Sequence, residues 1–190
     1  MINSFVFLQH TSNKANERGF TLIEMLVVAA IIGFMTTSLV TNFSRTKLDL
    51  SRTVNLMKST IRQAQVNTVS STKYNDYTPC GYGIHYMNAT SLAIYAGPNA
   101  ATTDCTSINR NYAAGQDSIV STQSIIDANI QFMSSFSDIF FEPPDPKTYL
   151  NNSFSLGQAP LAITIGKTGT TCPQDCKTIY VHSSGKIEIQ

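Results

Sequence analysis

The sequence predicts an α+β protein, in which one long N-terminal helix precedes an antiparallel β-sheet domain. Residues 25–44 contain no charged side chain, and no proline occurs between residues 20 and 78. Short apolar runs separated by Gly, Asn, Pro and Ser begin only after Lys73. Strands that follow a helix, rather than alternating with helices, are typical of the α+β class. The length of 190 residues suits one packed domain of this kind.

The apolar segment 20–41 is long enough to be a membrane span. A helix of about 20 residues rises about 30 Å, which matches the hydrocarbon core of a bilayer. Apolar side chains lie on all its sides, which argues against an amphipathic surface helix. Lys14 and Arg18 precede the segment, so the positive-inside rule keeps its N-terminal end in the cytoplasm. We expect a single-pass orientation with the rest of the chain outside; the alternative is a helix buried in a soluble core.

The helix is predicted to continue beyond the apolar segment and to cover residues 20–72. Apolar residues there recur at intervals of three and four, which places them on one stripe of a helix. They are Leu50, Val54, Met57, Ile61 and Ala64. Five cations and one carboxylate surround this stripe: Arg45, Lys47, Arg52, Lys58, Arg62 and Asp49. We interpret this cationic face as solvated, with lipid headgroups, neighbouring subunits or nucleic acid as alternative partners.

Residues 73–190 are predicted to form a β-rich globular domain. Alternating apolar and polar residues, bounded by turn-forming residues, indicate each strand. The expected strands are residues 82–86, 92–95, 118–126, 130–133, 139–141, 161–165, 178–182 and 187–189. The first two are expected to form a hairpin, and the last two form another around a turn at residues 183–186.

Glu24 is the one charged residue of the stretch 20–40. A carboxylate at the centre of a membrane helix costs about 2.5–3.5 kcal/mol, so such a residue is usually functional. Glu24 lies near the predicted helix start, where the macrodipole favours negative charge. A role in assembly is one interpretation, and a carboxylate that merely reaches the headgroups is the other.

The residues around Glu24 resemble those of a known family. The run RGFTLIE at residues 18–24, followed by MLVV at 25–28, resembles the prepilin N-terminus of type IV pilins and type II secretion pseudopilins. Residues 42–45, residues 141–143 and the terminal hairpin are similar to the H-type minor pseudopilins. The resemblance implies a pilin-like fold, with a helix that spans the membrane in its first half and packs on the β domain in its second.

The same resemblance implies a processing and assembly pathway. Prepilin peptidase would cleave after Gly19 and remove residues 1–19 as a leader, and Phe20 would become the methylated N-terminus. Glu24 would attract the amino terminus of a neighbouring subunit as the helices stack into a filament. Opposite charges in a bundle of low dielectric constant select the register strongly.

The expected function is therefore that of a non-catalytic, membrane-anchored filament subunit. We favour a minor pseudopilin of a type II secretion system, located in the bacterial inner membrane with residues 73–190 extracytoplasmic and incorporated in a pilus or pseudopilus. Its expected partners are prepilin peptidase, other pilin or pseudopilin subunits and the membrane. The alternatives are a type IV pilus minor pilin that serves DNA uptake and an unrelated anchored binding module. The chain ends without a basic extension, so no nucleic acid partner is predicted.

Four cysteines lie in the part expected outside the cytoplasm: Cys80, Cys105, Cys172 and Cys176. An even number in an oxidising compartment indicates two disulfides, for which three connectivities exist. We favour Cys80–Cys105 and Cys172–Cys176. The alternative is a zinc site with His85 or His182, although Cys-x3-Cys is a poor pair of zinc ligands.

Neither catalysis nor a cofactor is expected. The three histidines suggest no triad, and no complete phosphate loop occurs in the sequence. Asp138, Glu142 and Asp145 flank three prolines and offer oxygen ligands for calcium. Their spacing fits no known calcium loop, so we favour a solvated, proline-stiffened loop and expect no metal.

Overall fold

The computed structural model describes residues 21–144 and 147–190, without the side chains of residues 39–47. The chain divides into two compact units, of which the first ends at Phe43 and the second comprises Ser44–Gln190. Among the described residues, one helix precedes nine strands. These elements are α1 (Leu22–Val69), β1 (Tyr82–Asn88), β2 (Ser91–Ala96), β3 (Ser118–Ser124), β4 (Ile130–Phe132), β5 (Ile139–Glu142), β6 (Lys147–Leu150), β7 (Leu161–Lys167), β8 (Cys176–Val181) and β9 (Ile187–Ile189).

The C-terminal half of α1 follows the predicted stripe and ends in a defined cap. The five stripe residues from Leu50 to Ala64 are all buried. At the end, Ser71 has a φ of 47°, in the left-handed region. The Thr72 N–H donates to the Asn67 carbonyl and the Ser71 N–H donates to the Thr68 carbonyl, both at 3.0 Å. These two bonds form a Schellman motif, which satisfies carbonyls that the helix end leaves without partners.

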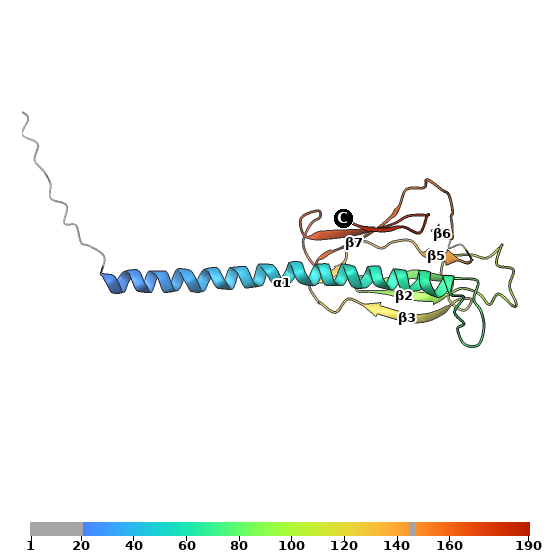
Figure 1. Cartoon of the computed structure of the whole chain (residues 1–190), viewed down its shortest axis with the longest axis horizontal. Coiled ribbons are helices and arrows are strands. Elements are labelled where there is room, and N and C mark those ends of the chain that lie inside the picture. Colours follow the sequence, from blue (N-terminus) through green and yellow to red (C-terminus); the bar gives the residue numbers. More distant parts are fainter. Residues whose placement is uncertain (1–20, 145–146) are drawn as a thin grey trace, which may run out of the picture. The chain divides into compact units, whose positions relative to one another are not determined.

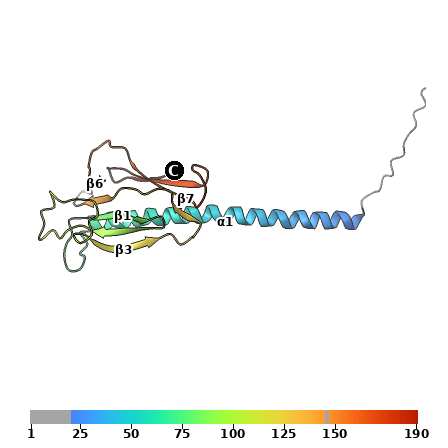
Figure 2. The same ribbon diagram turned by 180° about the vertical axis from the view of Figure 1, so that it is seen from behind.

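Two antiparallel sheets enclose this half of the helix. The five-stranded sheet has the order β3-β2-β1-β5-β6, and the four-stranded sheet has the order β4-β7-β8-β9. Within the unit Ser44–Gln190, α1 runs between β2 and β3 on one side and β7 on the other (Figure 1), and the view from behind agrees (Figure 2). The α+β class predicted from the sequence is therefore confirmed.

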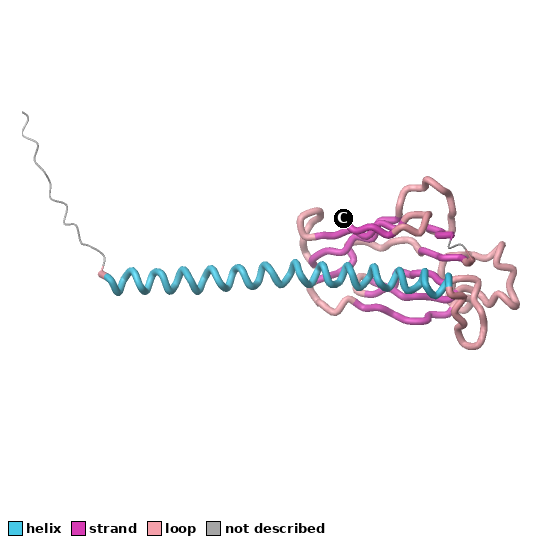
Figure 3. Tube along the Cα trace, in the orientation of Figure 1, coloured by secondary structure: helices cyan, strands magenta, loops and turns pink. Residues whose placement is uncertain are grey.

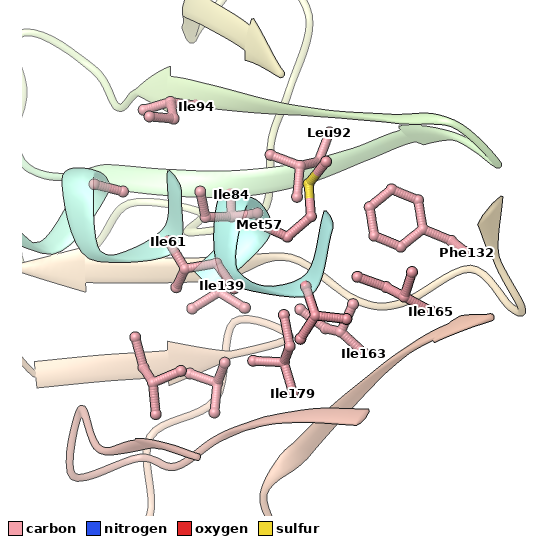
Figure 4. Packing of buried hydrophobic residues seen from close by; sticks show 14 of the residues in the cluster. Met57, Ile61, Ile84, Leu92, Ile94, Phe132, Ile139, Ile163, Ile165 and Ile179 are labelled. Atoms are coloured by element: carbon pink, nitrogen blue, oxygen red, sulfur yellow. The ribbon is translucent and has the colours of Figure 1, made fainter. Parts of the chain in front are cut away.

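The core lies where the helix meets both sheets. Met57 and Ile61, each with 0% of its surface exposed, point from α1 into this space. Figure 4 shows Ile84 and Leu92 of the five-stranded sheet above them and Ile163 and Ile179 of the four-stranded sheet below. Because one stripe of α1 contacts both sheets, its burial holds the two sheets in one core.

Every strand expected from the sequence is present within a few residues, and both hairpins are confirmed: β1 pairs with β2, and β8 with β9. The sequence did not indicate β6, which pairs with β5. This strand has four residues, of which Thr148 and Leu150 are buried. Its alternation is too short to be recognised before its partner is known.

Candidate assembly site at the start of α1

Thr21 and Glu24 form a reciprocal cap at the beginning of α1. The backbone N–H of Thr21 donates to Glu24 Oε2 at 3.1 Å, and the Thr21 hydroxyl donates to the same oxygen at 3.2 Å. In return, the Glu24 N–H donates to Thr21 Oγ1 at 3.3 Å. This is the capping box expected for a Thr followed three residues later by a Glu. It fixes the carboxylate at the positive end of the helix dipole.

Thr21 is thus a site residue to which the resemblance to the prepilin motif assigns no role of its own. The signal was present, because the pattern Thr-x-x-Glu before an apolar run predicts a capping box. In the described structure Glu24 therefore stabilises its own helix, in addition to the assembly role proposed for it below.

The helix that follows this cap presents an apolar surface without a cover from the described residues. Leu22 is 79% exposed and Phe34 is 75% exposed. The other large apolar residues exposed here are Ile23, Met25, Leu26, Val27, Val28, Ile31, Ile32 and Met35. Contiguous apolar surfaces of this extent mark sites of contact with membranes or with other proteins.

No helical stretch within the described residues meets the length and apolarity needed to cross a bilayer. The membrane span over residues 20–41 stays a prediction. The expected leader, residues 1–19 with Gly19 at its end, and the expected mature N-terminus Phe20 lie outside the described residues. The side chains of residues 39–47, which include the end of the expected span, are also outside the described part of the chain.

The four cysteines form the two favoured pairs. Cys80 is bonded to Cys105, at a sequence separation of 25, and Cys172 is bonded to Cys176. The described residues contain no cluster of three or more His, Cys, Asp or Glu side chains arranged to hold a metal ion. His85 instead contacts Asp138, and His182 contacts Glu188.

The two disulfides should differ in what they contribute to stability. In the chain-entropy account, closing a 25-residue loop contributes about 3 kcal/mol, and the short Cys172–Cys176 loop contributes less, about 2 kcal/mol. We therefore expect the pair Cys80→Ser and Cys105→Ser to lower the melting temperature more than Cys172→Ser and Cys176→Ser. Thermal unfolding of the full chain in detergent tests this order, and equal melting temperatures would contradict it.

The expectation of a solvated loop for Asp138 and Glu142 is wrong. The Asp138 side chain is 11% exposed, and its Oδ1 lies 2.7 Å from His85 Nδ1. Its Oδ2 accepts the backbone N–H of Tyr112 at 2.7 Å. Glu142 ends β5 and forms an ion pair with Arg110 at 3.0 Å. Both carboxylates are held inside the fold, and Asp145 lies outside the described residues.

A family model described as the prokaryotic N-terminal methylation motif matches residues 14–40. No curated protein and no solved structure matches the chain. The matched range includes Gly19, Phe20, Thr21 and Glu24, and thus the whole capping box. Such a motif implies processing by prepilin peptidase, anchoring in a membrane and assembly with other pilin subunits. The chain therefore carries a prepilin-type N-terminal methylation motif, which supports its placement in the type IV pilin and pseudopilin family.

Proposed function

We propose that this protein is a minor pseudopilin of a type II secretion system, without catalytic activity of its own. It is anchored by a single pass through the bacterial inner membrane, with residues 73–190 extracytoplasmic. Prepilin peptidase removes residues 1–19 on the cytoplasmic side, and Phe20 becomes the methylated N-terminus. The β domain then faces other minor subunits or the secreted protein.

The observation that carries this proposal is the combination of an apolar helix surface with one fixed carboxylate. The apolar side chains from Leu22 to Met35 favour a surrounding of lipid or of other apolar helices over water. Within that surrounding, Glu24 is held at the helix start by Thr21. A helix that is apolar on all sides and charged at one fixed point can pack in a bundle while its charge selects one register.

The second half of α1 has a different task in this proposal. Its apolar stripe is buried against both sheets, so it holds the β domain at a defined place on the helix. Helix packing therefore determines where the outer domain sits along the filament. A type IV pilus minor pilin would use the same construction, and the partners recovered with the protein distinguish the two machines.

Processing is the first test of the proposal. We expect the mature chain to begin at methylated Phe20, and we expect Gly19→Leu to leave the precursor at full length, because a bulky residue blocks the cleavage position. Mass spectrometry of the membrane-extracted protein measures both. Recovery of assembled wild-type protein that retains residues 1–19 would contradict the proposal and favour an unrelated anchored module.

A further inference from the structure

The loop between β2 and β3, residues 97–117, contains a groove that takes no part in the assembly site. The loop extends from the end of β2, at the end of the Ser44–Gln190 unit where α1 also ends (Figures 1 and 3). Loops of more than about 12–15 residues without helices or strands are uncommon in compact domains, and those that are ordered are usually functional. The structure holds this loop in place by several independent contacts.

One end of the loop is tied to the segment that precedes β1. Cys105 is bonded to Cys80, and the Cys80 N–H donates to the Pro98 carbonyl at 2.8 Å. The Ala100 N–H donates to the Thr78 carbonyl at 2.9 Å. Ile108 is buried with Cys80 in a small apolar cluster, which anchors the middle of the loop.

Arg110 anchors the other part of the loop from within. Its Nη1 donates to the Ile108 carbonyl at 3.2 Å, and its Nη2 donates to the Cys105 carbonyl at 3.3 Å. The guanidinium also pairs with Glu142 at 3.0 Å and lies over the Tyr149 ring at 4.0 Å. A cation held by two carbonyls, a carboxylate and an aromatic face keeps the loop in one conformation. The groove is therefore formed before any ligand arrives.

The groove has a volume of about 520 Å³, within the range of small-molecule sites. Its lining offers two kinds of surface. Pro98 and Ile108 are apolar. The amides come from Asn99, Asn109 and Gln116, and the hydroxyls come from Thr102, Thr103 and Ser107. None of the described residues that line it carries a charge.

The charged side chains of the loop bind other groups of the protein and are not among the described residues that line the groove. Arg110 is paired with Glu142. Asp117 is 8% exposed and accepts the Ala113 N–H at 2.8 Å, and burial raises the pKa of its carboxyl group. Asp104 accepts hydrogen bonds from the backbone and hydroxyl of Thr106, which lower its pKa. The groove thus presents mainly neutral hydrogen-bonding groups, with the apolar Pro98 and the largely buried Ile108 beside them.

We propose that this groove binds a neutral oligosaccharide. A sugar ring has an apolar C–H face and a rim of hydroxyl groups, and the groove combines apolar side chains with amides that each donate and accept hydrogen bonds. The absence of charge among the described lining residues favours neutral sugars over uronic acids or amino sugars. Preorganisation of the loop lowers the entropic cost of binding.

An extended peptide is the rival occupant, and the fold argues against it. Extended peptides gain much of their affinity by adding a strand to an exposed sheet edge. The groove is formed by loop residues between the end of β2 at Ala96 and the start of β3 at Ser118. Side chains rather than a strand edge provide its hydrogen bonds.

Binding is tested on the full chain in dodecylphosphocholine, a detergent without a sugar headgroup. The probes are cellohexaose, maltohexaose and N-acetylchitohexaose. Saturation-transfer NMR detects the binding of each saccharide, and titration gives its affinity. We expect at least one to bind, and we expect Gln116→Ala and Thr103→Val each to weaken binding about tenfold. Gln123→Ala removes an amide from β3, outside the groove, and should leave binding unchanged.

Three results would overturn the proposal. They are the failure of all three saccharides to bind, binding that neither groove variant weakens, and binding of an uncharged Ser- and Asn-rich peptide in place of the saccharides. Thermal unfolding of each variant shows whether it is folded, and Thr103→Val removes the hydroxyl group with little change of shape. Glu24 is not among the described residues that line the groove, so a negative result here leaves the proposed filament function standing.

Discussion

The Glu24→Leu variant is expected to insert into the membrane and to be processed, yet to enter the filament at least about a hundredfold less than the wild-type chain. In the proposed bundle, the Glu24 carboxylate faces the amino group of a neighbouring subunit. Removing one partner of a buried ion pair leaves the other charge uncompensated, which costs about 3–5 kcal/mol. Co-purification of the variant with partner subunits, normalised to the membrane-inserted amount, measures this effect.

Glu24→Gln is the matched control, because it separates the charge from the cap. Glutamine also serves in a capping box, so the bonds with Thr21 can persist. If the charge drives assembly, Glu24→Gln fails as severely as Glu24→Leu. Assembly of the Gln variant at the wild-type level would show that the helix cap, rather than ion pairing, is what Glu24 contributes.

The Ile61→Ala variant should produce the largest loss of stability in the β domain. Ile61 is fully buried on the stripe of α1 that contacts both sheets. Replacing a buried Ile by Ala removes apolar contacts and leaves a cavity, at a cost of about 2–5 kcal/mol. We expect the melting temperature to fall by about 10 °C. The near-ultraviolet circular dichroism of the tyrosines measures this unfolding transition.

Val66→Ala provides the comparison on the same helix. Val66 is 58% exposed, so its truncation should change stability by about 0.5 kcal/mol or less. Equal losses for Val66→Ala and Ile61→Ala would contradict the central place of the stripe in the core. A loss confined to Ile61→Ala would confirm that α1 joins the two sheets.

The parts of the fold that the sequence predicted are those with local periodicity. Met57 and Ile61 recur at helical spacing, so their burial could be inferred without a partner. The terminal hairpin was recognised because its turn and both strands lie within a few residues of one another. The capping box of Thr21 and Glu24 is equally local, because the pattern Thr-x-x-Glu before an apolar run can be recognised from the sequence alone.

The parts that were missed depend on residues far apart in the sequence. Asp138 meets His85 across 53 positions, and Glu142 meets Arg110 across 32 positions. These pairs form only once β5 lies beside β1 and the 97–117 loop folds back on β5 and β6. Neither of these two pairs can be predicted from the prolines around residue 144, which indicate an exposed loop. The strand β6 likewise depends on its pairing with β5, so its short sequence alone does not indicate it.

The contact between Glu24 and the amino terminus of a neighbour is the centre of the proposed assembly. Dicyclohexylcarbodiimide enters apolar bundles and joins a carboxylate directly to an adjacent amine, so it can link such a pair inside purified filaments. Mass spectrometry should then detect a peptide in which Glu24 is bonded to the processed N-terminus of a neighbouring subunit. Filaments that contain the chain but yield no Glu24 link, while other buried carboxylate–amine pairs react, would contradict the account.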